Sequence, residues 1–273
     1  MDVATVDELF ARDRRDERTA LVDRTGREYD AHWLCTTAWK AGNFLRHAGV
    51  REGTTVGVVG DGPLALVSFL GTTLLEGTTR FEPPSDLSSE DGFRALVAPV
   101  TVLESGTYDL PPGAQRLGYG EKPTEPAVQH FDAGLWSENP SFPPRSIDPS
   151  VAMVSDGDRL VSHETALEAA RDVIDEYGLA AGDRVVVREP WPVLETVVAG
   201  VIAPLLADGV VVLADGEGVS ALEDETKERA FEDGELDGSI EPPARGEYAV
   251  SSEPVPEPER IVPDSVSLDD PLF

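Results

Sequence analysis

Two segments of the sequence follow one pattern: GVREGTTVGVVGDGPLALVSFLG at residues 49–71 and GLAAGDRVVVREPWPVLETVVAG at residues 178–200. In both, glycine stands at the first, fifth and last positions and proline at the fifteenth. The second segment begins 129 residues after the first. Four matching Gly and Pro positions at one constant separation indicate a duplicated structural unit.

Each copy predicts the same succession of elements. A helix ends at the first glycine, a Gly-led turn follows, and a strand, an apolar helix and a second strand come next. The predicted elements are Val-rich strands at 55–59 and 184–187, helices at 64–76 and 194–207, and second strands at 78–82 and 210–213. We therefore predict an α/β fold with two similar, layered, β-α-β-containing subdomains, and equivalent places for the two Val-rich strands in separate sheets or halves.

Two strands and a capped helix are predicted before each Val-rich strand. A strand–turn–strand pattern over residues 19–29 precedes a helix that Asp30 can cap. A second pattern over residues 151–161 precedes a helix at 164–177, with Ser162 as its cap.

Composition divides the chain into four regions. They are a first α/β subdomain at 1–84, a variable region and Pro-rich linker at 85–150, a second α/β subdomain at 151–215 and an acidic Pro-rich tail at 216–273. Short strand candidates at 95–97 and 100–103 lie in the variable region. A helix candidate at 217–231 opens the tail, which is otherwise predicted to be irregular.

The net charge of −30 is extreme, with 52 Asp and Glu against 22 Lys and Arg, of which only three are Lys. Such a surface repels nucleic acid and anionic membranes, so we expect neither as a partner. The charge is typical of a halophilic protein kept soluble in concentrated salt, where screening removes the repulsion between carboxylates. The alternative is a specific acidic interaction surface.

A single cysteine, Cys35, rules out a disulfide within the chain, and its helical, apolar surroundings favour a packed residue over a nucleophile. A reducing cytoplasm is the expected compartment. The start of the chain has no signal-peptide pattern, and the longest apolar runs are too short to span a bilayer. The four histidines are isolated, so no metal site is expected.

Several short runs resemble a known family. They are ALVD at residues 20–23, LRHAGV at 45–50, VGV at 56–58, GDRV at 182–185 and PLL at 204–206. Their order over about residues 5–215 resembles the AMP-binding, acyl-adenylate-forming enzymes, which include acyl-CoA synthetases, luciferases and adenylation domains. In that family two related sheet-and-helix subdomains pack face to face. The resemblance therefore implies a partial N-terminal domain of this type.

The family's phosphate loop is rich in Ser, Thr and Gly and ends in Pro-Lys-Gly. The matching position here holds Ser155-Asp156-Gly157-Asp158-Arg159, without the lysine and with two carboxylates where a triphosphate would lie. Carboxylates beside phosphate repel it. Two interpretations stay open. The segment is a plain hairpin turn, or it is a residual anion site in which Ser155 and Gly157 donate hydrogen bonds and Arg159 supplies the positive charge.

Three other functional elements that the resemblance implies have no recognisable counterpart after Asp215. They are the magnesium motif, the ribose-binding aspartate and the lid with its catalytic lysine. ATP or AMP, Mg²⁺ and CoA are therefore cofactors by resemblance only, and we expect none of them to be required. We also expect no catalytic residue in this chain, because adenylation needs cations to neutralise the developing charge.

Two further residues are candidates for ligand contact. Trp191 follows a Val-rich strand, at the strand end where α/β folds place ligands, although it can equally cover the helix that follows. His163 resembles a family position that opens onto the acyl pocket, with a structural role as the alternative. Gly60-Asp61-Gly62, the equivalent segment of the first copy, is interpreted as a loop with a capping role. We expect any ligand between the two copies, edged by Trp191, His163 and the 155–159 turn, and we expect a neutral or singly charged acyl group.

Three functions remain open at this point. The first is a degenerate, non-catalytic relative of AMP-dependent acyl-CoA ligases that acts as a binding or regulatory protein, with a full-length acyl-CoA synthetase or another protein as a partner. The second is a half-enzyme that binds an acyl or adenylate ligand and is completed by a partner chain. The third is an acidic scaffold protein without a ligand.

Overall fold

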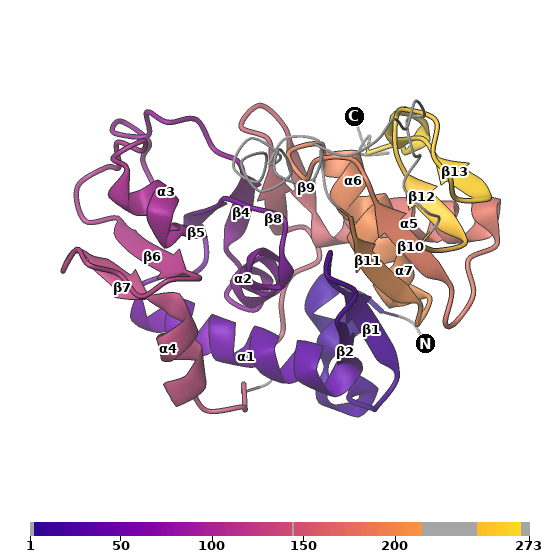
Figure 1. Cartoon of the computed structure of the whole chain (residues 1–273), viewed down its shortest axis with the longest axis horizontal. Helices are drawn as coiled ribbons and strands as arrows, with labels where there is room; N and C mark the ends of the chain where they lie inside the picture. Colours follow the sequence, from indigo (N-terminus) through magenta and orange to yellow (C-terminus); the bar gives the residue numbers. More distant parts are fainter. Residues whose placement is uncertain (1–2, 144, 215–244, 269–273) are drawn as a thin grey trace, which may run out of the picture.

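The computed structural model describes residues 3–143, 145–214 and 245–268. These residues form two sheets with helices packed between and around them (Figure 1). We call the six-stranded sheet A and the seven-stranded sheet B. Within the described residues, no helix combines the length and the apolar character needed to cross a bilayer.

Sheet B carries the first repeat. Its strand order is β7 (Val128–His130), β6 (Gln115–Tyr119), β5 (Phe93–Pro99), β3 (Thr55–Val58), β4 (Thr78–Phe81), β8 (Ala152–Ser155) and β9 (Leu160–Ser162). All neighbours are parallel except the β8–β9 pair. The region expected to be variable thus supplies three strands, β5 to β7, to this sheet.

Sheet A carries the second repeat. Its strand order is β13 (Glu259–Ile261), β12 (Tyr248–Val250), β10 (Arg184–Val187), β11 (Val210–Leu213), β1 (Thr19–Val22) and β2 (Glu28–Asp30). Only the β1–β2 pair is antiparallel. The strand β3 lies between β5 and β4 in sheet B, and β10 lies between β12 and β11 in sheet A. The predicted equivalence of the two Val-rich strands is confirmed.

The two hairpins are exchanged between the repeats. The β1–β2 hairpin precedes β3 in the chain, yet β1 pairs with β11 of sheet A. The β8–β9 hairpin precedes β10, yet β8 pairs with β4 of sheet B. Each sheet is therefore completed by residues of the other copy, and buried side chains from both form one common core cluster.

The helices follow from capping and apolar spacing. They are α1 (Ala31–His47), α2 (Pro63–Thr73), α3 (Val100–Glu104), α4 (Phe131–Ser137), α5 (His163–Tyr177), α6 (Leu194–Val197) and α7 (Ala203–Leu206), with a π-helical turn, Val198–Ile202, between the last two. As predicted, the Asp30 carboxylate accepts from the Trp33 amide at 2.6 Å, and the Ser162 hydroxyl accepts from the Thr165 amide at 3.1 Å. Each cap satisfies an amide that has no partner within its helix.

Two predictions about local structure are wrong. Residues 100–103, predicted as a strand, form helix α3, because Val100 and Leu103 are three residues apart and both are buried on one helix face. The predicted irregular tail contains two short strands: β12 pairs in parallel with β10, and β13 pairs in parallel with β12. The predicted helix at 217–231 lies outside the described residues.

Candidate functional site: a cavity between the two sheets

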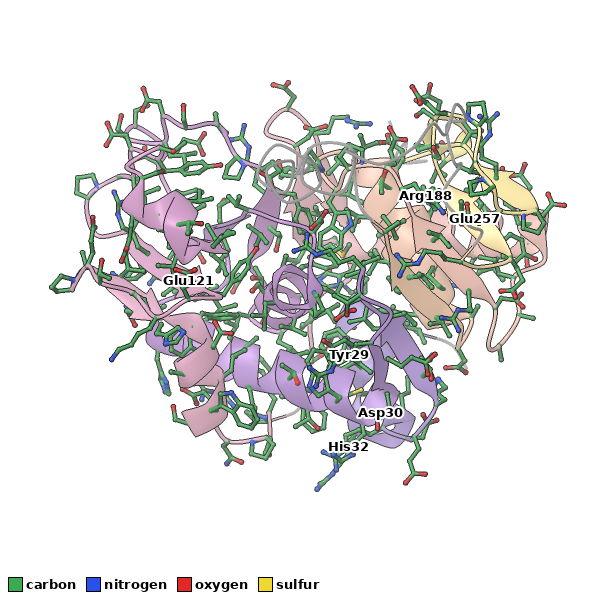
Figure 2. The ribbon with its side chains drawn as sticks, in the orientation of Figure 1. Tyr29, Asp30, His32, Glu121, Arg188 and Glu257 are labelled. Carbon is green, nitrogen blue, oxygen red and sulfur yellow. The ribbon has the colours of Figure 1, made fainter. Side chains whose placement is uncertain are left out.

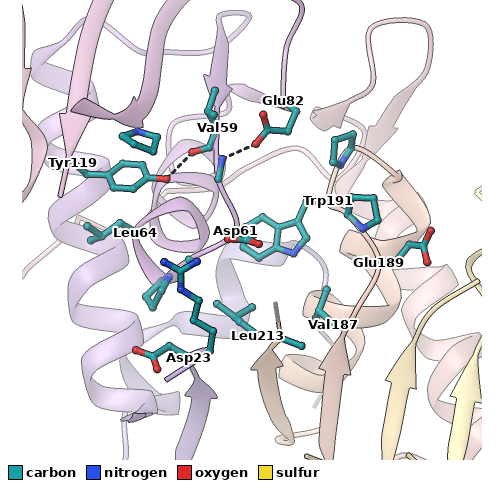
Figure 3. Close-up of a pocket in the computed structure, with 18 of the residues that line it drawn as sticks. Asp23, Val59, Asp61, Leu64, Glu82, Tyr119, Val187, Glu189, Trp191 and Leu213 are labelled. Atoms are coloured by element: carbon teal, nitrogen blue, oxygen red, sulfur yellow. Dashed lines mark hydrogen bonds between the residues drawn. The ribbon is translucent and has the colours of Figure 1, made fainter. Parts of the chain in front are cut away.

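A cavity of about 690 Å³ lies where the carboxyl ends of strands from both sheets meet (Figure 3). Its lining comes from the carboxyl ends of β3, β4, β5 and β6 of sheet B and of β1, β10 and β11 of sheet A, together with the segments that follow most of them. Parallel sheets leave such crevices because their connections diverge at the strand ends. The cavity lies between the two copies, where the sequence predicts a ligand. Ligand binding itself stays a prediction.

Three segments of sheet B are locked together on one wall. The Tyr119 hydroxyl donates to the Val59 carbonyl at 2.7 Å, and the Gly60 amide donates to a carboxylate oxygen of Glu82 at 2.6 Å (Figure 3). Gly60 has a φ of +101°, and a side chain at this position would collide with the Tyr119 hydroxyl. Glycine is therefore required at this turn.

Glu82 is held in an unusual conformation. Its φ is +42°, a region that residues with a side chain rarely adopt. The surrounding protein raises the pKa of the Glu82 carboxyl above its usual range. The hydrogen bond from Gly60 opposes this shift, and the negative charge of Asp61 adds to it. Glu82 is thus a carboxyl group facing the cavity whose ionised form is disfavoured.

Trp191 forms part of the opposite wall. Its indole ring is buried and packs edge-to-face against Phe81 of β4, with ring centroids 5.0 Å apart. It also lines the cavity. One ring therefore joins the core of the two sheets and borders the cavity, and its contact with a ligand stays a prediction.

Several charged groups of the lining are already paired. The Arg188 guanidinium binds both carboxylate oxygens of Glu257, at 2.8 and 2.6 Å (Figure 2). Glu189 accepts from the Ser252 amide at 2.8 Å. The Asp23 carboxylate accepts four hydrogen bonds from its own hairpin. These groups hold strand ends together and leave little capacity for a ligand.

The carboxylates of the lining outnumber the cations. The carboxylates are Asp23, Asp61, Glu82 and Glu189, and the cations are Arg24 and Arg188. A polyanion would enter this cavity against a net negative charge. Within the described residues, no group of three or more His, Cys, Asp or Glu could hold a metal ion to offset it.

The 155–159 turn binds its own amides and lies outside the cavity lining. The Gly157 amide donates to the Ser155 hydroxyl at 2.9 Å. The amides of Asp158 and Arg159 both donate to one carboxylate oxygen of Asp156, at 2.9 and 2.8 Å. The Asp156 carboxylate therefore occupies the amides that a phosphate would need, and these residues do not fit a triphosphate.

The positive charges beside this turn are also neutralised. Arg159 binds Asp156 at 2.9 Å and Glu195 at 2.6 Å. Its hydrogen bonds to Glu195 and then Asp156 raise the pKa of the guanidinium further. A second guanidinium, that of Arg80, lies against Gly157 and binds Glu90 at 2.8 Å. The sequence offered only Arg159 as the positive charge of this turn, but β4 brings Arg80 there as well.

His163 is a structural residue. Its side chain is fully buried at the start of α5, and its Nδ1 accepts a hydrogen bond from the Val6 amide at 3.0 Å. Burial lowers the pKa of the imidazole from 6.5 to about 4. The residue does not line the cavity. Of the five predicted contact residues, only Trp191 borders the cavity, whereas Ser155, Gly157, Arg159 and His163 do not.

Solved structures share this architecture. The anthranilate CoA ligase AuaEII, solved in complex with anthranoyl-AMP, matches with a TM-score of 0.68 at 17% identity over 90% of this chain and 49% of that one. A benzoate CoA ligase from Burkholderia xenovorans LB400 matches with a TM-score of 0.66 at 16% identity over 90% and 50%. The N-terminal domain of FACL13 from Mycobacterium tuberculosis matches with a TM-score of 0.67 at 13% identity over 92% and 63%.

This is the fold of the acyl-adenylate-forming enzymes. The sequence prediction of a partial N-terminal domain of this type is confirmed at the level of the fold. The chain spans about half the length of the two CoA ligases. No family model matches the chain, and no curated protein matches it.

Most residues of the cavity wall were not predicted from the sequence. Asp61 lies in the segment equivalent to the one around Trp191, so the repeat itself was a signal for it. Glu82 and Tyr119 carry no comparable signal. They meet only because β4, β3, β5 and β6 are neighbours in sheet B.

Proposed function

We propose that this chain is a non-catalytic binding protein built on the acyl-adenylate-forming fold. In this proposal it holds a mainly apolar small molecule, with a neutral or singly charged polar group, in the cavity between the sheets. Binding would serve a regulatory role, since the described residues combine a cavity with a turn that does not fit a triphosphate.

The observation that carries the proposal is the state of the 155–159 turn. Its amides are used by Asp156 and Ser155, and its one guanidinium is used by Asp156 and Glu195. Adenylation needs free donors and cations around the phosphates, in place before the reaction starts. A turn that has satisfied its own donors supplies neither.

The cavity supports binding of an apolar body. Its volume of about 690 Å³ lies within the usual range for small-molecule sites. Trp191, Leu64, Val102 and Leu213 supply apolar surface from both sheets. Burial of such surface gives affinity roughly in proportion to area, without any need for a phosphate contact.

A second candidate is the half-enzyme that a partner chain completes. The coverage of about half of each CoA ligase favours it. In this case a full-length acyl-CoA synthetase or another protein would supply the missing cations, and ATP with Mg²⁺ would bind only to the complex.

The test is a thermal-shift series in molar salt with ATP–Mg²⁺, AMP, CoA and a panel of small aromatic and aliphatic compounds. We expect stabilisation by apolar compounds, none by ATP–Mg²⁺, and no pyrophosphate exchange by the pure chain. Exchange at the rate of an ordinary synthetase would overturn the proposal. Stabilisation by ATP–Mg²⁺ only in the presence of a synthetase would favour the half-enzyme.

Substitutions at two tryptophans test where the ligand binds. Trp191→Phe should remove most of the fluorescence change that a cavity ligand causes. Trp136→Phe is the matched control, because Trp136 is 84% exposed, lies on α4 outside the cavity lining and has the Lys40 ammonium above its ring. Arg159→Ala should leave ligand affinity unchanged. Equal signals from both Trp variants would place the ligand elsewhere.

A further inference from the structure

We propose that the polar end of the cavity ligand is an organic cation, an ammonium or guanidinium group on an apolar body, held between Asp61 and Glu82. This inference rests on the proposed binding function and names the ligand class of the same cavity. It differs in charge from the carboxylates that the fold would suggest.

The first argument is the pairing state of the cavity charges. Asp61 lines the cavity and has no hydrogen-bond or ion-pair partner among the described residues, and Glu82 uses one oxygen, for the Gly60 amide. Arg188, by contrast, is engaged by both oxygens of Glu257. Arg24 is the remaining lining cation, so one guanidinium stands against the two carboxyl groups of Asp61 and Glu82.

The second argument is the mutual position of the two carboxylates. The Glu82 carboxylate accepts from the amide of Gly60, the residue before Asp61, and both carboxyl groups line the cavity. Beyond the effect of burial, the negative charge of Asp61 adds to the raised pKa of Glu82, and both carboxylates raise the pKa of Tyr119 against the opposing charge of Arg24. The two carboxylates repel each other, and the single guanidinium of Arg24 faces both of them across the lining. A bound ammonium or guanidinium group relieves this repulsion, because it donates charge-assisted hydrogen bonds to both carboxylates.

The third argument is independent of charge: part of the lining lacks free backbone donors, although Arg24 and Trp191 keep side-chain N–H groups there. Four of its residues are prolines, which have no backbone N–H: Pro63, Pro99, Pro190 and Pro192. The Tyr119 hydroxyl donates to Val59, and the Gly60 amide donates to Glu82. A ligand that brings its own donors fits this wall better than one that needs them.

The start of helix α2 does not reverse this preference. Gly62 and Pro63 place the positive end of the helix at the cavity, which by itself would favour an anion. Asp61 directly precedes the Gly62 cap and already faces that end with a negative charge. The aromatic rings of Trp191 and Tyr119 in the lining add a surface that attracts cations.

The experiment compares three probes with one skeleton: 2-phenylethylamine, 2-phenylethanol and 3-phenylpropanoate. Calorimetric titration in molar salt at neutral pH should show tightest binding for the amine and weakest for the carboxylate. Glu82→Gln and Asp61→Asn should each lower the affinity for the amine by about 10-fold or more, which is the effect of losing one charge-assisted hydrogen bond. Neither variant should change the affinity of the alcohol by a comparable factor.

Glu121→Gln is the matched control, because Glu121 is an exposed carboxylate outside the cavity lining (Figure 2). It removes the same charge and should leave amine affinity unchanged. Melting temperatures of all variants check that they fold, and Glu82→Gln keeps an acceptor for the Gly60 amide.

Equal or tighter binding of the carboxylate would overturn the cation assignment and leave the cavity as a binding site. Equal losses in Glu121→Gln and Glu82→Gln would overturn it too, because the effect would then come from net charge. Absence of binding by all three probes would also overturn it. The broader panel and the Trp191→Phe signal test the proposed function separately.

Discussion

Asp156 shows how a single residue changes the chemistry of a turn. Its carboxylate accepts from two amides of its own turn and from the Arg159 side chain. Partial burial alone would raise its pKa, but the hydrogen bonds from Arg159 and Asp158 hold the pKa of Asp156 below its usual range. The turn therefore stays closed on its own carboxylate at neutral pH.

Asp156→Ala should lower the free energy of unfolding by about 1 kcal/mol, the usual cost of losing a side chain that satisfies turn amides. Asp158→Ala is the matched control, since Asp158 has the same charge, lies in the same turn and makes no side-chain hydrogen bond among the described residues. Denaturant unfolding in molar salt measures both. Equal effects of the two variants would contradict the role given to Asp156.

His163 predicts a defined pH dependence. Its pKa is lowered to about 4 in the folded chain from 6.5, so the unfolded chain takes up this proton at higher pH. The stabilising contribution is therefore complete above pH 6.5 and is lost as the pH falls towards 4. Relative to His163→Asn, the wild type should lose about 3 kcal/mol over this window.

Asparagine is the suitable replacement because its side-chain oxygen can accept from the Val6 amide as Nδ1 does, without titrating. Unfolding free energies at several pH values, in molar salt, give the difference between the two proteins. Parallel pH profiles would show that the imidazole is protonated without cost and would refute this reading.

At the scale of elements, the repeated glycines serve different contacts. A Cβ on Gly71 of α2 would lie 2.7 Å from the Gly42 nitrogen of α1, so this glycine lets two helix backbones approach. Gly200, its counterpart in the second copy, lies in the π-helical turn against the Val187 side chain. One sequence pattern therefore supports a helix–helix contact in one half and a helix–sheet contact in the other.

Gly71→Ala should destabilise the protein by about 1–3 kcal/mol, because the neighbouring atoms belong to backbone and cannot rotate away. This holds although alanine by itself favours the helix by up to about 1 kcal/mol. Gly62→Ala at the cap of the same helix has no atom within 4 Å of the added methyl and should change stability little. Thermal unfolding of both variants measures these effects, and a higher melting temperature of Gly71→Ala than of the wild type would contradict the prediction.

For the whole molecule, charge decides the conditions for stability. With 52 carboxylates and 22 basic residues, a net charge of −30 remains after every basic residue is counted. The screening length falls from about 10 Å at 0.1 M salt to about 3 Å at 1 M. The melting temperature should therefore rise between these salt levels, whereas most proteins change little.

A sodium chloride series monitored by circular dichroism measures this rise, and a sucrose series serves as the uncharged control. A melting temperature that stays flat or falls with salt would mean that repulsion between carboxylates does not limit the stability of the fold. A rise of equal size with sucrose would mean that exclusion of the solute from the protein surface, rather than screening of the carboxylate charges, causes the stabilisation.

Local chemistry explains which features the sequence could give in advance. Strand and helix periods, the Gly and Pro positions of the repeat, and the caps Asp30 and Ser162 are all contained in short contiguous segments. Such patterns act over one or two turns of chain, so they can be read without knowing what packs on them. The β-α-β repeat followed from them, whereas the acyl-adenylate-forming fold was implied by the resemblance of short runs such as residues 20–23 and 45–50 to that family.

What the sequence by itself determined is the duplicated β-α-β architecture, the acidic character and the altered turn. Only the tertiary structure decided that the hairpins exchange sheets, that Tyr248–Val250 forms a strand, and that Glu82 and Tyr119 share a cavity wall with Asp61. The reason is physical. These features depend on pairing between strands far apart in the chain, and many pairings are compatible with the same local preferences until burial of the common core selects one.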